Sequence, residues 1–367
     1  MRFKKIIGKI HLWLGLGSGL LVVFLGITGC ILAFETEIRK LTEPEQFVPV
    51  ENKAYLPPSV LKTAAEQYLD GKKLNTLEYP GRGRSALAAY YDTAHYKIVV
   101  LDPYSGKMLK LKNMNHDFFR IIINGHYYLW LPPAIGRPIV ATATLVFLVM
   151  LVSGIILWWP RNKAAKKQRF TFRWRAGWKR KNYDLHSVAG FYASWIAVFI
   201  AISGLVMGFQ WFAGSVYWIS SGGKTMQQDI HPVSDTSFAK NIPLPVCDRI
   251  WQQLSREAKA NESITIYFPL TGTDPIEGVI NHRPGTYYQS DYFHYDQYSG
   301  KELPATGIYA GKYRDATVAN RMSRMNYDIH VGAILGLPGK ILAFCGSLIA
   351  ASLPVTGFLL WRGRRKK

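Results

Sequence analysis

Four long apolar segments interrupt the polar parts of this chain. They lie at about residues 12–34, 138–159, 187–212 and 335–361, and each is long enough to cross a bilayer, which takes about 20 residues of helix. A helix buried in a soluble protein rarely stays apolar over such a length without a charged residue on one face. The pattern therefore predicts four membrane-spanning helices.

Two polar connections, at about 35–137 and 213–334, join the first segment to the second and the third to the fourth. The first contains PPSVLKTAAEQYL, whose apolar spacing fits a helix, and then alternating runs near 74–80, 86–91 and 96–101 that are typical of strands. The second repeats this order with LPVCDRIWQQLSREA, SITIYFP, IEGVINH and TYYQSDYFHY. We therefore predict a membrane α-helical protein with two small α+β outer domains.

The positive charge follows the ends of the apolar segments. The chain has 45 Lys and Arg against 24 Asp and Glu, and basic clusters occur in MRFKKIIGK, PRNKAAKKQRFTFRWRAGWKRKN and RGRRKK, which share one side after four crossings. The positive-inside rule makes that side the cytoplasm. We therefore predict a four-pass protein of the bacterial inner membrane, with both termini cytoplasmic and the long connections periplasmic. The lipid bilayer accounts for the charge, so no nucleic acid partner is expected.

These patterns divide the chain into nine parts. In order, they are the first transmembrane segment 1–34, the first periplasmic domain 35–115, an interfacial segment 116–137, the second transmembrane segment 138–159, a basic cytoplasmic loop 160–185, the third transmembrane segment 186–212, the second periplasmic domain 213–325, an interfacial segment with the fourth transmembrane segment 326–361, and a cytoplasmic tail 362–367.

The two halves of the chain repeat each other in their histidines and turns. His11 precedes Thr28 by 17 residues, and His186 precedes Ser203 by the same number. In the outer segments, the turn DPYSGK in the first half matches DQYSGK in the second. The repeated order predicts an internal duplication whose unit is span, outer domain, span.

A small hydroxyl residue followed by Gly occurs in every apolar segment. The stretch GITGC, residues 26–30, resembles a lipoprotein cleavage box, but Thr28-Gly29 has counterparts at Ser153-Gly154, Ser203-Gly204 and Thr356-Gly357. We therefore assign the pair to the membrane core, where small residues allow close helix packing.

Several classes of redox and metal protein lack their sequence signatures here. There are three cysteines, and the chain contains no CxxC, CxxCH or HExxH. A disulfide framework, covalently attached haem and a zincin site are therefore not expected. A flavin or nicotinamide fingerprint is also missing, so any electron donor is a separate molecule.

The order of these elements, the turns ending in YSGK, the TG and SG pairs and the segment HVGAILGLPGKI resemble the PepSY-associated transmembrane family, over nearly the whole chain. That family includes bacterial siderophore-iron reductases. The resemblance implies PepSY-like outer domains, two non-covalent b-type haems among the four helices, and release of iron from siderophores by reduction.

Four histidines support this expectation from their positions alone. A histidine within or at the mouth of a span is costly unless it has a partner. His11 and His186 are predicted at the cytoplasmic face and His126 and His330 near the outer face, so each level offers two imidazoles as axial haem ligands. The alternative, that these histidines anchor span ends among lipid head groups, stays open.

The neighbouring residues complete the predicted haem sites. Gly29, Gly154, Gly204 and Gly357 leave room for a flat macrocycle, although helix packing explains them about equally well. From His126 to Gly154 a continuous helix would span about 42 Å, so the chain must bend near Pro132 and Pro133. His116 is the rival ligand to His126. His95, His231, His282 and His294 lack ligand spacing and are expected to be surface or hydrogen-bonded residues.

Two classes of function follow. The first is a haem-dependent ferric-siderophore reductase, an oxidoreductase that takes electrons from a cytoplasmic or quinol donor. The second is a PepSY-type binding or regulatory membrane protein. A related alternative is a haem-containing subunit that delivers electrons to another periplasmic acceptor. No catalytic side chain is assigned, because electron transfer itself needs none.

Overall fold

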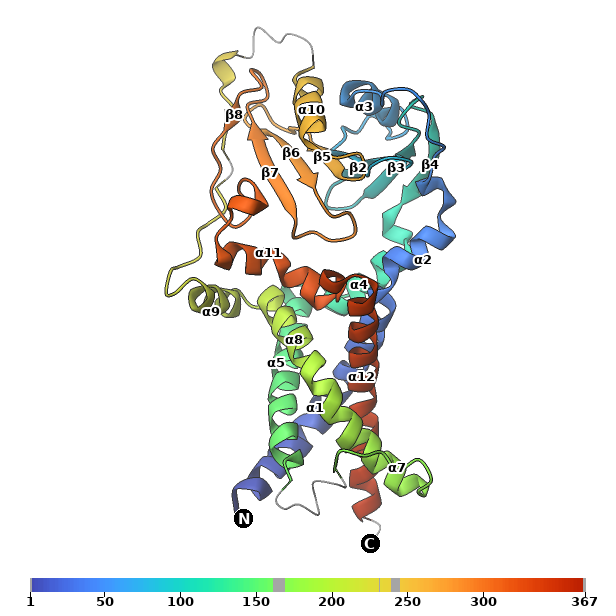
Figure 1. Ribbon diagram of the computed structural model, residues 1–367, viewed down its shortest axis with the longest axis vertical. Helices are drawn as coiled ribbons and strands as arrows, with labels where there is room; N and C mark the ends of the chain where they lie inside the picture. The colour runs from blue at the N-terminus through green and yellow to red at the C-terminus, as the bar shows by residue number, and fades with distance from the viewer. Residues whose placement is uncertain (1, 161–168, 231, 239–244, 366–367) are drawn as a thin grey trace. The chain divides into compact units, whose positions relative to one another are not determined.

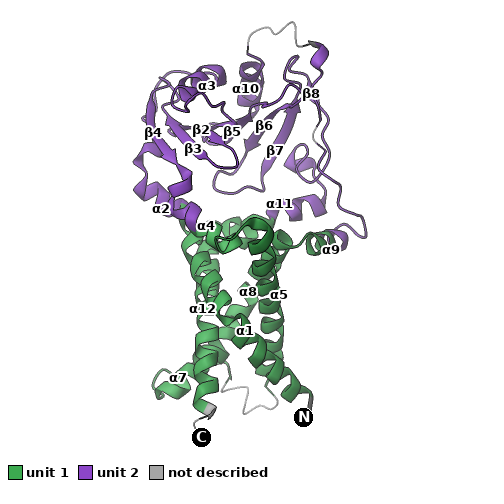
Figure 2. Ribbon diagram, turned by 180° about the vertical axis from the view of Figure 1, so that it is seen from behind, with its two compact units in different colours: residues 1–35, 122–216, 326–367 green, residues 36–121, 217–325 purple. Residues whose placement is uncertain are grey.

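The computed structural model describes residues 2–160, 169–230, 232–238 and 245–365. It divides into two compact units, coloured separately in Figure 2. The helical unit comprises Met1–Glu35, Ile122–Val216 and Asn326–Lys367, and the sheet unit comprises Thr36–Ile121 and Tyr217–Met325. Parts of the predicted basic loop (161–168) and of the tail (366–367) lie outside the described residues.

Four helices in the described part of the chain are long and apolar enough to span a membrane, which confirms the predicted number. They are α1 (Arg2–Ala33), α5 (Pro133–Trp158), α8 (Gly190–Gly208) and α12 (Leu337–Arg365). α8 continues without a break from α7 (Trp178–Asp184) through a π-helical turn (Leu185–Ala189). The third span therefore begins earlier than predicted and ends at Gly208, because extended backbone at Phe209 separates it from α9 (Gln210–Ser220).

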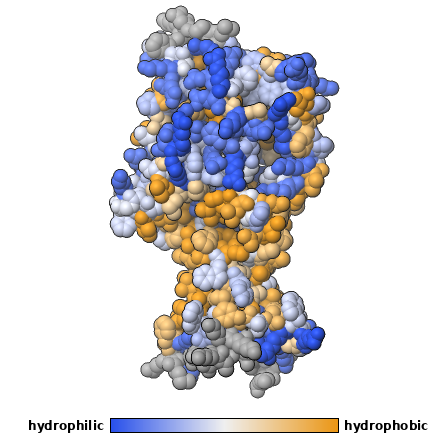
Figure 3. Space-filling view, in the orientation of Figure 1, coloured by the Kyte–Doolittle hydropathy of each residue, from blue (hydrophilic) through white to orange (hydrophobic). Residues whose placement is uncertain are grey.

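The four helices form a bundle (Figure 1) in which α1 and α8 each pack against both α5 and α12. Small residues allow this close packing. A Cβ atom on Gly26 would lie 2.8 Å from the Cβ of Ala351, and one on Gly208 would lie 2.7 Å from the Cβ of Ala141. Large apolar side chains such as Leu20 and Phe199 point outward, and much of the visible helical surface is apolar in Figure 3.

A short helix precedes α5 and another precedes α12, and the chain bends sharply after each. α4 (Phe118–Tyr128) is followed by Leu129 and Trp130, both in the left-handed region, and α11 (Val318–His330) is followed by Gly332 with φ +76°. Gly136 is required near the first bend, because a Cβ there would lie 2.0 Å from the carbonyl oxygen of Tyr128. The bend predicted near Pro132 and Pro133 is therefore present, and a second bend precedes α12.

The two outer segments share a single sheet, whereas the sequence predicted two separate small domains. The sheet has eight antiparallel strands in the order β4-β3-β2-β1-β5-β6-β7-β8. β1 pairs with β5, with Thr76 opposite Tyr267 and Tyr79 opposite Ile264. The strands are β1 (Thr76–Tyr79), β2 (Ala86–Tyr91), β3 (Tyr96–Leu101), β4 (Met108–Asn113), β5 (Ser263–Tyr267), β6 (Ile276–Asn281), β7 (Ser290–Tyr295) and β8 (Glu302–Leu303).

One helix from each outer segment packs into a common core with this sheet. α3 (Pro58–Glu66) contributes Leu61 and α10 (Val246–Glu257) contributes Ile250 and Leu254, and all three are fully or almost fully buried. Leu77 on β1 and Ile266 on β5 belong to the same apolar cluster. The order helix and four strands thus occurs twice along the chain.

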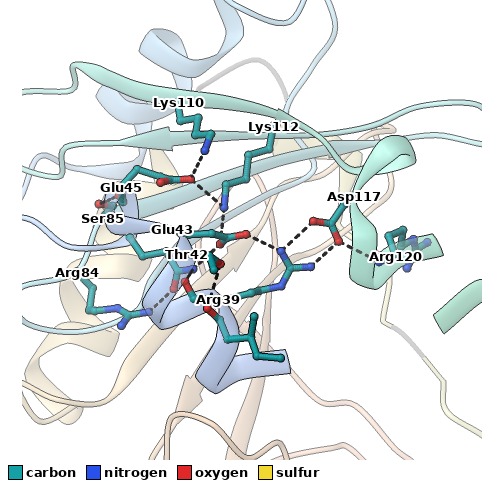
Figure 4. Close-up of polar contacts among 12 residues, drawn as sticks. Arg39, Thr42, Glu43, Glu45, Arg84, Ser85, Lys110, Lys112, Asp117 and Arg120 are labelled. Atoms are coloured by element: carbon teal, nitrogen blue, oxygen red, sulfur yellow. Dashed lines mark hydrogen bonds and ion pairs between the residues drawn. The ribbon is translucent and has the colours of Figure 1, made fainter. Parts of the chain in front are cut away.

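A polar network ties α2 (Glu35–Thr42) to β4 and to the start of α4 (Figure 4). The guanidinium of Arg39 donates to both carboxylate oxygens of Asp117, with Nη1 2.9 Å from Oδ2. It also donates to Glu43, whose other oxygen accepts from Lys112 at 2.6 Å. Since Asp117 also accepts from the Arg120 amide at 2.9 Å, it caps α4 while holding α2.

Candidate functional site: two histidine pairs

The helical unit brings the four predicted histidines together as two pairs. The ring centroids of His11 and His186 lie 6.5 Å apart with an interplanar angle of 85°. Those of His126 and His330 lie 6.2 Å apart at 63°. Each pair combines one histidine from each half of the chain, as the sequence predicted.

The spacing within each pair fits a single metal ion between the rings. Two metal–imidazole bonds of about 2 Å each, with the distance from ring nitrogen to ring centre on both sides, give roughly 6 Å. Within the described residues, no group of three or more His, Cys, Asp or Glu side chains is placed to hold a metal ion. An ion held here by two protein ligands would need its other ligands from water or from a bound group, such as the macrocycle that surrounds haem iron.

Each histidine is hydrogen-bonded at Nδ1 to a hydroxyl group on a neighbouring span. The hydroxyls belong to the four small residues that precede Gly in the apolar segments. The nitrogen–oxygen distances are 2.8 Å for His11 with Ser153, 2.8 Å for His126 with Thr28, 3.0 Å for His186 with Thr356 and 3.0 Å for His330 with Ser203.

Each of these hydroxyl groups donates its proton to a carbonyl oxygen of its own helix. Thr28 donates to the carbonyl oxygen of Phe24 at 2.8 Å, and Ser203 donates to that of Phe199 at 2.7 Å. Ser153 and Thr356 likewise donate to carbonyl oxygens of the preceding turn. A hydroxyl whose proton is engaged accepts a hydrogen bond, so Nδ1 carries the imidazole proton. Nε2 then has its lone pair free for a metal.

The glycine after each hydroxyl residue faces the same imidazole. A Cβ atom built on the glycine would lie close to the histidine Cε1, at a distance that differs among the four sites. These distances are 3.6 Å for Gly29 to His126, 3.4 Å for Gly154 to His11, 3.3 Å for Gly204 to His330 and 3.1 Å for Gly357 to His186. The absence of a side chain therefore makes room beside each ring, and a Cβ would fill part of it.

The pair His126 and His330 borders a cavity of about 540 Å³ that lies within the helical unit. Ligand sites typically occupy about 300–1,000 Å³. Most of the lining is small or apolar, including Gly29 and Gly204, and its charged side chains are Glu35 and Arg137. Arg137 donates to the carbonyl oxygen of Met207 at 2.6 Å and brings a cation to this cavity.

The imidazoles of this pair are held in their neutral form. Burial, and to a smaller extent the neighbouring His330, lowers the pKa of His126 to about 3. Burial also lowers the pKa of His330, to about 4. Near neutral pH both rings are therefore uncharged, which is the state in which imidazole binds a metal.

The rival ligand His116 is not part of either pair. It ends a 3-10 turn (Met114–His116), its side chain is exposed, and it belongs to the sheet unit. His126, in contrast, lies in the helical unit beside Gly29 and His330. The choice of His126 over His116 therefore agrees with the geometry.

Two of the other outer histidines, His95 and His282, have carboxylate partners. His95 is exposed beside Asp92, and His282 lies between Glu262 and Asp291, with both nitrogen–oxygen distances 3.0 Å. His294 is buried in β7. His231 lies outside the described residues.

A repeated pentapeptide was overlooked in the sequence. NYDLH ends at His186 and NYDIH ends at His330. In the structure, Asn182 donates to the carbonyl oxygen of Thr356 at 3.2 Å, and Asn326 donates to that of Ser203 at 3.0 Å. Each asparagine thus bonds to the residue whose hydroxyl contacts the histidine four positions later. The repeat itself was the signal that would have identified both asparagines.

The carboxylates of the two pentapeptides are also buried. Asp184 and Asp328 are both 0% exposed. Asp184 accepts from the backbone amide of Arg173 at 3.0 Å and pairs with Arg180 at 2.9 Å. Asp184 therefore fixes the segment that enters α7 to the start of the third span.

Comparison with known proteins identifies a family for nearly the whole chain. Residues 9–364 match the family model described as the PepSY-associated TM region. The match includes all four paired histidines and both outer segments. No curated protein matches the chain.

Proposed function

Because this chain belongs to the PepSY-associated TM family, and its bundle holds two histidine pairs, we propose that it is a dihaem reductase of the bacterial inner membrane. In this proposal it passes electrons across the membrane to ferric siderophores in the periplasm and releases ferrous iron. The observation that carries the proposal is the presence of two pairs at two levels of one bundle.

The separation of the two levels follows from α1. His11 and Thr28 lie on this one helix, 17 residues or about 25 Å apart. His11 belongs to the first pair, while Thr28 is bonded to His126 of the second. A single pair suffices to hold a structural haem. Two pairs, separated by most of the hydrocarbon thickness of about 30 Å, suit the transfer of electrons across a membrane.

The residues present fit non-covalent b-type haem. His11 with His186, and His126 with His330, would each hold one haem iron through Nε2. The glycine beside each ring leaves room for the macrocycle, and Arg137 offers a cation to the carboxylates of the group bound by the second pair. When bound, such a group supplies one-electron redox chemistry without an open coordination position.

The reaction balances with one external reductant. A cytoplasmic reductant donates one electron per iron, or one quinol donates two electrons to two irons in turn and releases two protons. Each ferric chelate accepts one electron and becomes a ferrous chelate. Hydroxamate, catecholate and carboxylate oxygens are hard ligands that bind Fe²⁺ much less tightly than Fe³⁺. One electron per iron therefore converts tight binding into release, and no bond in the siderophore has to break.

The orientation is proposed from the basic residues. Lys4, Lys5 and Lys9 lie at the start of α1, and Arg362 lies near the end of α12. The positive-inside rule places these ends in the cytoplasm. The pair of His11 and His186 is then on the donor side, and the pair of His126 and His330 is on the periplasmic side.

The test uses the purified full-length protein. It is reduced without oxygen and mixed with ferric chelates and a ferrous-specific trap, while absorbance follows both haem oxidation and trapped Fe²⁺. Oxidation with matching formation of Fe²⁺ supports the reductase. If all chelates fail but another periplasmic acceptor oxidises the protein, it is an electron-delivery subunit. A protein purified without haem would favour the binding or regulatory class.

A further inference from the structure

The four histidines share a repeated set of hydrogen-bond partners, which are hydroxyl groups at all four and asparagines near two of them. We propose that Thr28, Ser153, Ser203 and Thr356 are positioning residues that fix the imidazole tautomer, and that Asn182 and Asn326 reinforce this in the second half only. The inference rests on the proposed function, because bound haem reports the effect. It adds control of ligand geometry and redox potential to the same site.

The hydroxyl groups act through the ring nitrogen that does not face the metal. Each lies 2.8–3.0 Å from Nδ1, and His186 and His330 also lie 3.1 Å and 3.0 Å from the carbonyl oxygens of Leu353 and Ile200. The partner of the distal nitrogen sets the tautomer, orients the ring and raises the basicity of the ligating nitrogen. Removal of the hydroxyl weakens this control while leaving the ligand in place.

Each asparagine adds a second hydrogen bond between the helix that carries the histidine and the neighbouring span. Asn326 precedes His330 by four residues, so both side chains lie on the same face of α11. His330 Nδ1 bonds to the Ser203 hydroxyl, and Asn326 bonds to the Ser203 carbonyl oxygen. Two points of attachment restrict rotation of the helix that carries the ligand more than one does. Asn182 and His186 make the same two hydrogen bonds, to Thr356, at the other level.

Neither histidine of the first half has an asparagine at the corresponding position to make this second hydrogen bond. The residues four positions before His11 and His126 are Ile7 and Ile122, whose side chains cannot donate a hydrogen bond. Each pair therefore combines one reinforced histidine from the second half with one from the first half that lacks the asparagine. Since this asymmetry is the same at both levels, it belongs to the repeat and not to one face of the membrane.

The test compares the two haems of one protein, so that each serves as the control for the other. The variants Ser153→Ala and Asn182→Leu affect the level of His11, while Thr28→Val, Ser203→Ala and Asn326→Leu affect the level of His126. The measurements are spectroelectrochemical titration and low-temperature electron paramagnetic resonance of the oxidised full-length protein. We expect each hydroxyl variant to raise the potential of the haem at its own level, because a less basic imidazole stabilises ferric iron less. The other haem should not change.

Matched controls separate this effect from general damage to the bundle. Ser18 on α1 and Ser194 on α8 are also buried hydroxyl residues that donate to their own helices, at 2.9 Å and 2.7 Å. Ser18→Ala and Ser194→Ala should leave both potentials unchanged. Thr28→Ser and Ser153→Thr keep the hydroxyl and should restore wild-type values. We expect the asparagine variants to change the resonance of one haem with little loss of haem content.

Two outcomes would overturn the positioning proposal while leaving the reductase intact. One is that haem is bound but no hydroxyl variant shifts a potential. The other is that every variant, including the Ser18 and Ser194 controls, shifts both haems alike. If the protein contains no haem, the proposed function fails and the positioning role fails with it.

Discussion

The Oγ1 atom of Thr28 lies 2.8 Å from the Nδ1 atom of His126, although the two residues are 98 positions apart. The helix that carries Thr28 also carries His11, which belongs to the other histidine pair. α1 therefore supplies a candidate ligand at one level and a hydrogen-bond partner for a candidate ligand at the other. The third span does the same with His186 and Ser203.

This shared use of two helices predicts which substitutions separate the two proposed haems. We expect His11→Ala or His186→Ala to remove or convert one haem, and His126→Ala or His330→Ala to do so to the other. Haem content by pyridine haemochrome assay and the reduced absorbance spectrum provide the measurement. Each single variant should either lose about half of the bound haem or keep it with the spectrum of one haem changed, since each site has lost one of its two imidazoles.

His116→Ala is the control for these variants. Its exposed side chain lies in the sheet unit, so both haems should remain. If His116→Ala removes a haem and His126→Ala does not, the assignment of the second pair is wrong.

The sequence predicted the paired histidines because their spacing to the hydroxyl residues repeats within single helices, where 17 residues have a fixed length. It did not predict the bond from Thr28 to His126, because contacts between helices depend on their rotation and leave no local pattern. The pairing of β1 with β5 was missed for a similar reason. Thr76 and Tyr267 are 191 positions apart, and nothing in either strand indicates that its edge is paired. The pentapeptides NYDLH and NYDIH were a local signal and were visible in the sequence.

The proposed topology predicts opposite labelling at two exposed lysines. In a variant with Cys30, Cys247 and Cys345 replaced, Lys107→Cys between β3 and β4 should react with a membrane-impermeant maleimide in spheroplasts. Lys179→Cys in α7 should react only after the membrane is disrupted. Both lysines are exposed, so access to the reagent and not burial decides the result. The reverse pattern would overturn the orientation and exchange the donor and acceptor sides.

His282 predicts a pH dependence that belongs to the sheet unit. Partial burial opposes its charge, but hydrogen bonds to Asp291 and Glu262 outweigh burial and raise its pKa above the usual 6.5. A raised folded pKa adds stability that is fully present below pH 6.5 and is lost as the pH rises through the folded value. His282→Gln should therefore lower the free energy of unfolding more at pH 5.5 than at pH 9.

The size of this effect is limited by solvent. The His282 side chain is 36% exposed, so we expect the difference between the two pH values to be less than about 1 kcal/mol. Denaturant unfolding of the sheet unit, followed by tryptophan fluorescence, measures it. His95→Gln, an exposed substitution beside a single carboxylate, is the control. An equal loss of stability at both pH values would mean that packing, and not charge, explains the role of His282.

The glycines beside the histidines predict a graded response to a single added methyl group. A Cβ on Gly357 would lie 3.1 Å from Cε1 of His186, which forces the ring to move by a few tenths of an ångström. The corresponding distance for Gly29 and His126 is 3.6 Å, an ordinary van der Waals contact. We therefore expect Gly357→Ala to displace the imidazole of His186 and disturb haem at that level, with a cost of about 1–3 kcal/mol in the bundle, while Gly29→Ala should have the smallest effect of the four. Gly204→Ala and Gly154→Ala, with distances of 3.3 Å and 3.4 Å, should have effects between these two.

The measurements are haem content, electron paramagnetic resonance and the melting temperature. Gly17→Ala on α1, where a Cβ meets nothing within 4 Å, is the control. An effect of Gly29→Ala as large as that of Gly357→Ala would show that contact with haem or helix packing, and not the position of the imidazole, determines the need for glycine.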